Sequence, residues 1–200
     1  MPSDRLPTDT VLLRVQGPPP QPQTLTQRLE GRAACRDLGA SIGLVAWSAD
    51  TGMGYVHVAL SCRIALSRAA VAGLAGVAAG AAHVEVARLA LMNDIAGRST
   101  GHPAPFHYAV EMTPASGFGV ELQRWYDREH LPGLADVPGC VRARRFWNHD
   151  AGPQSLACYD LLTQETLGSP AWLEVRGTDW SHRMRPRFTQ TRRTMFTVLG

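Results

Sequence analysis

The chain has 200 residues, of which 44% are hydrophobic and 18% are charged, an ordinary balance for a globular protein. This length can bury a sizeable core, either as one domain or as two small similar ones. The net charge of +3 is too small to indicate nucleic-acid binding. All 20 basic residues are arginines, which excludes Schiff-base chemistry, a pyridoxal-phosphate anchor and a P-loop lysine.

Cysteine spacing and the N-terminus indicate a cytoplasmic protein. The four cysteines are far apart and form no C-x-x-C pair: Cys35, Cys62, Cys140 and Cys158. The first ten residues, MPSDRLPTDT, are polar and lack the apolar segment of a signal peptide, so we expect reduced thiols. The apolar stretch 69–82 is shorter than the roughly 20 residues that a membrane span needs. We therefore predict a buried or half-buried helix there and no membrane partner.

The first half of the chain predicts the element order β-α-β-β-α-β. Val- and Leu-rich or alternating segments predict strands at 10–16, 41–48, 54–60 and 83–92. Helices are predicted from 24 or 26 to 38 and at 61–81, although three glycines weaken the second prediction. The turn signal Asp50-Thr51-Gly52 predicts a hairpin between the second and third strands.

The second half repeats this order after a loop at 93–105 that is rich in Gly, Ser and Pro, and that we interpret as a linker. Strands are predicted at 106–112, 140–147, 155–162 and 193–199, and helices at 117–131, 163–175 and 178–187. Ser116 is the expected N-cap of the helix at 117–131, and Pro132 is expected to end it.

Two βαββαβ units of about a hundred residues each match the ferredoxin-like split pattern. A repeat of that length indicates a duplication rather than a solenoid. Each unit exposes one sheet face that needs cover. The sequence therefore predicts an α+β fold of two tandem ferredoxin-like units, 1–97 and 104–200, whose antiparallel sheets pack on each other.

The stretch 121–146, ELQRWYDREHLPGLADVPGCVRARRF, concentrates aromatic rings, a histidine and several arginines. It contains W-Y-D-R-E-H-L-P at 125–132, V-P-G at 137–139 and R-A-R-R-F at 142–146. These motifs resemble the dimeric α+β-barrel superfamily, and more narrowly its EthD-like group, over roughly residues 104–199. Leu122 and Gln123 stand near the places where that group commonly has phenylalanine and asparagine. The first half matches only in element order, so it resembles a degenerate copy.

The resemblance implies ferredoxin-like units paired through their sheets as an α+β barrel. A single chain with both units suffices as a monomer, and a homodimer is the alternative. The superfamily includes lactone isomerases, polyketide cyclases, cofactor-free monooxygenases and haem proteins. It therefore implies a fold more narrowly than it implies a reaction.

Three residues of the central stretch point to acid–base chemistry. Leu122, Tyr126 and His130 stand at i, i+4 and i+8, so they share a helix face. Packed on a sheet, this face places a phenol and an imidazole beside a cavity. At a helix C-terminus the dipole favours the imidazolium and burial favours the neutral ring, so we expect His130 to titrate near neutrality. The alternative is a structural His130 that hydrogen-bonds the backbone near Pro132.

Aromatic residues around this helix are predicted to bind the substrate. Trp125 and Trp147 are interpreted as walls of an aromatic pocket, with ordinary core packing as the alternative. Tyr108 joins the same pocket if the aromatic face of the strand at 106–112 packs on the helix. Its neighbour His107 then points toward the other half of the chain.

Arginines of the strand at 140–147 are the predicted anion-binding groups. Arg144 lies on one face of that strand and Arg145 on the other. An inward-pointing arginine binds a carboxylate, an enolate or a phenolate of the substrate. The alternative is a salt bridge to Asp127 or Glu129.

We predict no metal and no cofactor. His107 with Glu111, and His57 with Glu85, could contribute ligands, but the sequence shows no tight metal-ligand spacing. It also has neither a G-x-G-x-x-G fingerprint nor a G-x-S-x-G elbow. Haem binding through a histidine is an alternative. A basic patch is interpreted as solvated surface, with an acidic carrier protein or an anionic substrate as the alternative partner: Arg183, Arg185, Arg187, Arg192 and Arg193.

These observations favour a cofactor-free enzyme that acts on a small apolar, aromatic or polyketide-like molecule. His130 transfers a proton while Tyr126 and Arg145 stabilise an enolate-like charge during isomerisation, cyclisation or elimination. The first alternative is a cofactor-independent monooxygenase on the same fold. The others are a non-catalytic ligand-binding protein and a haem-binding protein.

Overall fold

The computed structural model describes residues 4–200, and the contacts among them define two compact units. The first three residues of the polar N-terminus lie outside the described part. The first unit extends to residue 91 and adds 148–151 and 196–200, and the second comprises 92–147 and 152–195. The division therefore falls inside three strands, β4 (His83–Ala96), β8 (Phe188–Val198) and, at its last residue, β6 (Cys140–Asn148), each of which contributes residues to both units.

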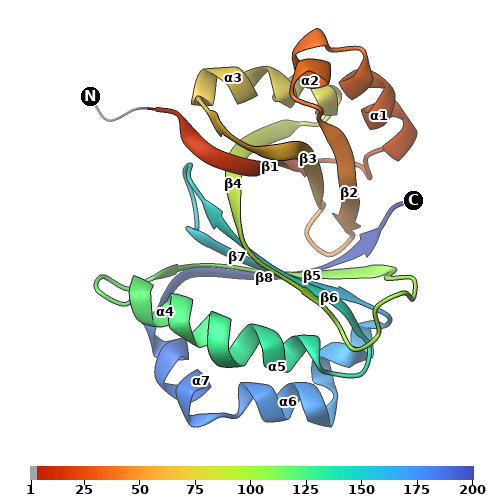
Figure 1. The fold of residues 1–200 in the computed structure, drawn as a ribbon. Coiled ribbons are helices and arrows are strands. Elements are labelled where there is room, and N and C mark those ends of the chain that lie inside the picture. Colours follow the sequence, from red (N-terminus) through yellow and green to blue (C-terminus); the bar gives the residue numbers. More distant parts are fainter. Residues whose placement is uncertain (1–3) are drawn as a thin grey trace. The chain divides into compact units, whose positions relative to one another are not determined.

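The first unit is an antiparallel sheet with helices on one of its faces (Figure 1). Its further elements are β1 (Leu6–Gln16), α1 (Pro22–Glu30), α2 (Ala33–Asp37), β2 (Ser41–Ser48), β3 (Met53–Leu66) and α3 (Arg68–Ala72). β1 pairs with both β3 and β4, and β2 pairs with β3. The end of β8 extends this sheet, because Val198 pairs with Ala46 of β2. Alternate residues of these strands pack under the helices around the fully buried Val11, Leu13 and Val56.

The predicted helix at 61–81 is wrong in its first part, because β3 continues to Leu66. The helix begins after Ser67, whose hydroxyl oxygen accepts a hydrogen bond of 3.1 Å from the Ala70 backbone N–H. The glycines in this segment weaken α-helical continuation, and after Ala72 the chain forms a 3₁₀ turn, Gly73–Ala78. The predicted helix at 24–38 is likewise divided into α1 and α2.

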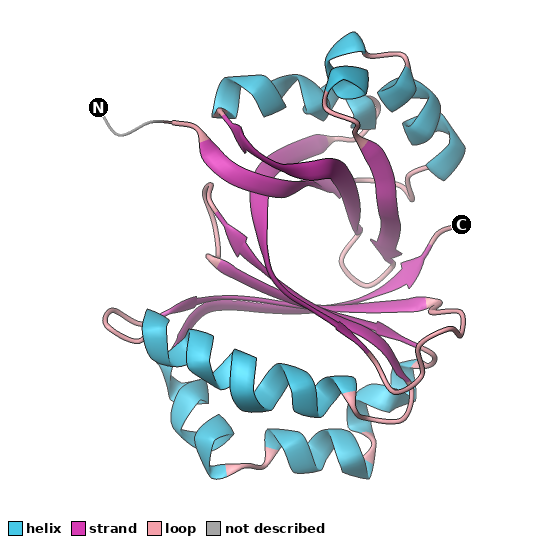
Figure 2. Ribbon diagram, viewed as in Figure 1, coloured by secondary structure: helices cyan, strands magenta, loops and turns pink. Residues whose placement is uncertain are grey.

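The second unit has the same element order, with all its helices on one face of its sheet (Figure 2). Its further elements are β5 (Phe106–Pro114), α4 (Gly119–Trp125), α5 (Leu131–Ala135), β6 (Cys140–Asn148), β7 (Ser155–Leu161), α6 (Pro170–Arg176) and α7 (Asp179–Met184). β7 pairs with β5 and β6, and β8 lies beside β5. The core between this sheet and the helices centres on large buried rings: Trp125, Tyr126, Tyr159 and Trp172.

The α+β fold class is confirmed, since each unit combines an antiparallel sheet with helices in the order β-α-β-β-α-β. An origin of the two units by duplication, and membership of the EthD-like group, stay predictions. No helix within residues 4–200 is long and apolar enough to cross a bilayer.

The central helix continues through Pro132 to Ala135, so the predicted stop at Pro132 is wrong. Between α4 and α5 lies a π-helical turn, Tyr126–His130, in which the Leu131 N–H donates to the Tyr126 carbonyl five residues earlier. A proline inside a regular α-helix lacks a donor N–H and clashes with the carbonyl four residues before it. The one-residue shift of the hydrogen-bond register just before Pro132 allows the helix to continue.

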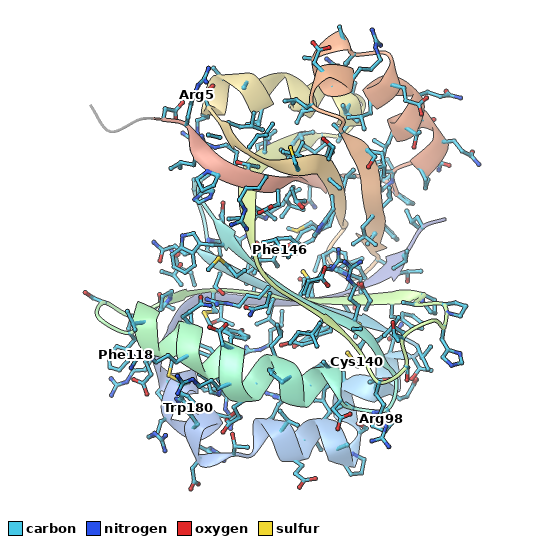
Figure 3. The ribbon with its side chains drawn as sticks, viewed as in Figure 1. Arg5, Arg98, Phe118, Cys140, Phe146 and Trp180 are labelled. Carbon is cyan, nitrogen blue, oxygen red and sulfur yellow. The ribbon has the colours of Figure 1, made fainter. Side chains whose placement is uncertain are left out.

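The start of this helix also differs from the prediction. The N-cap position is Phe118, which makes no side-chain cap, so Ser116 is not the cap. Figure 3 labels Phe118 at this helix start, and its ring lies 4.4 Å from the guanidinium carbon of Arg187. A cation–π contact therefore holds the first turn of α4 against the segment that leads into β8.

Candidate functional site

A cavity of about 40 Å³ lies in the second unit, walled by its sheet and its helices. Aromatic rings and arginines dominate its lining: Tyr108, Val110, Trp125, Tyr126, His130, Leu134, Tyr159, Trp172, Arg176, Ser181, Arg185, Phe188 and Arg193. Pockets for whole drug-sized ligands usually measure roughly 300 Å³ or more. This cavity therefore takes a group of a few heavy atoms, and a larger substrate must displace some of the side chains at its edge.

The π turn builds one wall of the cavity. The rings of Trp125 and His130 are stacked, with their centroids 4.0 Å apart and their planes inclined by 18°. Residues five apart lie on different sides of a regular α-helix, so the wider π turn is what brings these two rings over each other. Tyr126 meets the same imidazole edge-on, at 5.6 Å and 70°. π turns inside α-helices occur frequently at functional sites.

His130 is a neutral imidazole in this environment. Burial, followed by the charges of Arg176 and Arg185, lowers the pKa of His130 to about 3. The prediction that it titrates near neutrality is therefore wrong, because desolvation and two cations disfavour the charged ring, and the helix continues to Ala135, so His130 does not lie at a helix C-terminus. Its Nδ1 atom is buried and has no hydrogen-bond partner within residues 4–200. The imidazole thus keeps a ring nitrogen that no protein group occupies.

Tyr126 and Arg145 form a buried pair beside the imidazole. Burial raises the pKa of Tyr126 to about 12, although Arg145 and Arg193 act in the opposite direction. The phenol is therefore a neutral hydrogen-bond donor. The guanidinium carbon of Arg145 lies 4.6 Å from the Tyr126 ring centroid, and its nitrogens donate to Gln123 Oε1 at 2.5 Å and to Ser155 Oγ at 3.2 Å. Arg145 is fully buried and supports the phenol from outside the cavity.

The structure brings together Tyr108, Trp125, Tyr126 and His130 of the predicted site, since all four line the cavity. The other predicted residues lie elsewhere. Leu122 is a fully buried core residue, and Arg145 lies behind Tyr126.

Arg144 and Trp147 also lie outside the lining. Arg144 forms an ion pair of 3.0 Å with Asp160 rather than with Asp127 or Glu129. Trp147 is half-buried near the end of β6, opposite Ser155. Neither side chain therefore contacts a ligand that occupies the cavity.

Sequence reasoning missed most of the wall opposite the central helix. Trp172 and Arg176 come from α6, where their i, i+4 spacing was the available signal. Arg185 and Arg193 were interpreted as part of a solvated basic patch, yet both line the cavity. Tyr159 comes from β7, whose residues are buried at nearly every position. The sequence therefore has no polar–apolar alternation there to show which face of the strand carries Tyr159.

The charged side chains among the described residues of the lining are all arginines. Arg185 is held by backbone carbonyls, since its Nη2 donates to the Arg176 oxygen at 2.7 Å and its Nε to the Ser181 oxygen at 3.2 Å. The side chains of Arg176 and Arg193 make no hydrogen bond or ion pair within residues 4–200. The cavity therefore has a positive potential that is not balanced by a lining carboxylate.

Haem does not fit this cavity. A porphyrin needs far more space than about 40 Å³, and the imidazole of His130 is covered on one face by the Trp125 ring. Making room for the macrocycle would require removing several of the buried rings that form the core of this unit.

No protein-family model matches the sequence, and no curated protein matches it. Solved structures do match its fold. An anthrone oxidase-like protein aligns with 100% of this chain and 93% of its own, at a TM-score of 0.60 and 10% identity. A monooxygenase-like protein from Listeria innocua aligns with 96% of this chain and 95% of its own, at a TM-score of 0.53 and 8% identity. A variant chlorite dismutase from Candidatus Nitrospira defluvii aligns with 96% of this chain and 92% of its own, at a TM-score of 0.56 and 7% identity. These identities show similarity of fold alone.

The low pKa of His130 predicts a stability that depends on pH. The unfolded imidazole binds a proton below its ordinary pKa of 6.5, whereas the folded one stays neutral down to about 3. Between these values the free energy of unfolding should therefore decrease as the pH falls, by up to about 1.4 kcal/mol per pH unit.

Urea unfolding of the wild type and of His130→Gln at pH 7.5, 5.5 and 4.5 measures this contribution. The wild type should lose stability relative to the variant at each step down in pH. Replacing the exposed His102 by glutamine should leave the pH dependence of the wild type unchanged. Parallel curves for the wild type and His130→Gln would show that the imidazole is not buried in its neutral form.

Proposed function

We propose that the second unit is a small-molecule enzyme that uses His130 as a general base. The observation that carries this proposal is the neutral imidazole of His130 in the lining of a cavity walled by aromatic rings and arginines. A base must be unprotonated at the working pH and must reach its proton directly. His130 satisfies the first condition across the physiological range.

The first step is the removal of a proton from a carbon acid or a hydroxyl group of the substrate. The negative charge that develops is stabilised by the arginines of the lining and by the phenol of Tyr126, which remains a donor at neutral pH. The imidazolium so formed is a strong acid, because its environment opposes the charge. It therefore returns its proton rapidly to another atom of the intermediate, which favours isomerisation, cyclisation or elimination.

A second candidate is a cofactor-independent monooxygenase, and the names of the structural neighbours favour it. The same deprotonation gives an electron-rich anion that can reduce dioxygen. On a CH₂ group between two aromatic rings, one oxygen atom becomes the ketone oxygen, and the other leaves as water with the two hydrogens of the CH₂ group. A fused-ring substrate of this kind enters only if the arginine side chains at the cavity edge move outward, since the cavity is about 40 Å³.

Anthrone serves as the test compound, because its CH₂ group is an acidic carbon acid. The purified protein is incubated with anthrone in buffer that contains a chelator, and oxygen uptake is recorded. Exchange of the CH₂ hydrogens with solvent deuterium is followed in parallel without oxygen. Oxygen uptake above the background supports the monooxygenase, and exchange without uptake supports the acid–base enzyme. Binding of anthrone with neither reaction would support a non-catalytic ligand-binding protein and reject both proposals for this substrate.

A further inference from the structure

The polar groups around the cavity that lack a protein partner are mostly hydrogen-bond donors. The guanidinium groups of the half-buried Arg176 and the exposed Arg193 make no hydrogen bond or ion pair within residues 4–200, and both are accessible to solvent. The indole N–H groups of Trp125 and Trp172 are buried and also lack an acceptor in the described part of the chain. His130 can act as donor or acceptor according to its tautomer. A ligand that completes these groups must therefore offer acceptors.

The charges of the lining lead to the same conclusion. Burial is the largest cause of the lowered pKa of His130, and Arg176 and Arg185 lower it further. Burial raises the pKa of Tyr108, and Arg193 and Arg176 act to lower it. Three cations therefore lie close enough to affect other groups of the cavity. Like charges in a partly enclosed site repel one another, and an anion between them relieves that repulsion.

We propose that this cavity binds its substrate through a carboxylate group that Arg176 and Arg193 hold. The proposal rests on the same pocket as the proposed function and names the class of substrate. A carboxylate is planar, so it fits between flat aromatic walls and matches the fork of donors on a guanidinium. It is also a group of few heavy atoms, as a cavity of about 40 Å³ requires.

A bound carboxylate also assists the base. The ionisable side chains that face His130 across the cavity are Tyr108, Tyr126, Tyr159, Arg176, Arg185 and Arg193. The tyrosines are neutral and the arginines are positive, so each charge that the imidazole meets here is repulsive. An anion placed among the arginines offsets this repulsion, which makes His130 a stronger base when the substrate is bound than when the cavity is empty.

The first experiment compares acetate with acetamide, which has the same shape and no charge. Each is titrated into the ¹⁵N-labelled full-length protein, and the indole N–H signals of Trp125 and Trp172 are followed. Both signals are assigned from the Trp125→Phe and Trp172→Phe variants. Acetate should shift them in a saturable manner at millimolar concentrations, and acetamide should bind at least about tenfold more weakly, since a hydrogen-bonded charge contributes roughly 1.4 kcal/mol or more.

The second experiment uses matched arginine variants. Arg193→Met should weaken acetate binding at least about tenfold, because it removes a guanidinium from the cavity. Arg192→Met changes the neighbouring residue of β8, which is exposed and lies outside this lining, and should leave binding unchanged. Arg176→Met and the exposed Arg183→Met form an equivalent pair on α6 and α7. All four side chains are at least partly accessible to solvent, so we expect the variants to fold, and their spectra verify this.

Equal binding of acetate and acetamide by the wild type would overturn the proposal. So would an equal loss of acetate binding in Arg192→Met and Arg193→Met, since that result indicates a general effect of net charge. The proposed function fails separately. Acetate binding without any turnover of anthrone removes the enzyme and keeps the anion site, whereas turnover that acetate does not inhibit keeps the enzyme and removes the anion site.

Discussion

Replacement of His130 by glutamine should lower the turnover of anthrone by about 10²- to 10⁴-fold, the usual contribution of a positioned general base. Glutamine keeps a similar volume and a polar end, so the stack on Trp125 loses its imidazole without leaving a large cavity. The loss should appear in kcat, because the base acts after binding. Oxygen uptake and hydrogen exchange, measured as above, give the rate of each reaction.

The pH profile makes this prediction sharper. A base with a pKa of about 3 in the free enzyme is already unprotonated at pH 5, so kcat/KM, which reports the ionisation of the free enzyme, should not show the decrease below pH 6.5 that an ordinary histidine gives. The control is His102→Gln, a change at an exposed histidine in the loop before β5, which should retain full activity. Unchanged turnover in His130→Gln would remove this residue from the mechanism.

Replacement of Asp150 by alanine should lower the free energy of unfolding by about 3–5 kcal/mol, the cost of leaving a buried charge without its partner. Within the first unit, the side chains of Arg88 and Asp150 are only 3% and 4% exposed. Arg88 donates from Nη2 to Oδ1 at 2.8 Å and from Nε to Oδ2 at 3.1 Å, and its backbone N–H donates to Oδ2 at 2.8 Å. Without this carboxylate, the buried guanidinium keeps its charge and loses two hydrogen bonds, and the backbone N–H of Arg88 loses a third; of its ion pairs, the one of 3.5 Å with Asp4 remains.

Arg68→Ala is the matched control, because Arg68 contacts the same carboxylate at 3.2 Å with a side chain that is 65% exposed. A surface ion pair of this kind contributes about 0–1 kcal/mol, so this variant should unfold in urea almost like the wild type. Equal losses in Asp150→Ala and Arg68→Ala would show that burial of the Arg88 pair contributes nothing.

The Arg88–Asp150 pair also predicts how the free energy of unfolding changes with pH. Burial alone would raise the pKa of Asp150, but the hydrogen bonds from Arg88 outweigh it and the pKa is lowered from its ordinary value of 3.8. The carboxylate therefore stabilises the fold above this value, and its contribution is lost as the pH falls through and below it. The difference between the wild type and Asp150→Ala should accordingly decrease in acid.

Four of the eight predicted site residues line the cavity. The proximity of Tyr126 and His130 follows from their i, i+4 spacing, whereas Trp125 stacks on His130 because of the π turn. Tyr108 followed from the alternation of its strand. Arg144 and Arg145 were placed wrongly, because alternation gives the two faces of a strand but not the partner that each face meets. Arg144 meets Asp160 of β7, and Arg145 lies behind the Tyr126 ring.

The sequence by itself determined the α+β class, the order of strands and helices, and the cluster of aromatic and imidazole side chains on the central helix, because periodicity and turn residues act over a few positions. The tertiary structure decided three things. It set the π turn that carries the helix past Pro132, the gathering of Arg176, Arg185 and Arg193 around one cavity, and the neutral state of His130. The π turn is a register shift just before Pro132 that periodicity does not indicate. The gathering of the arginines and the neutral state of His130 depend on burial and on charges contributed by segments that are far apart in the chain, and neither burial nor the distance between such segments is encoded in local spacing.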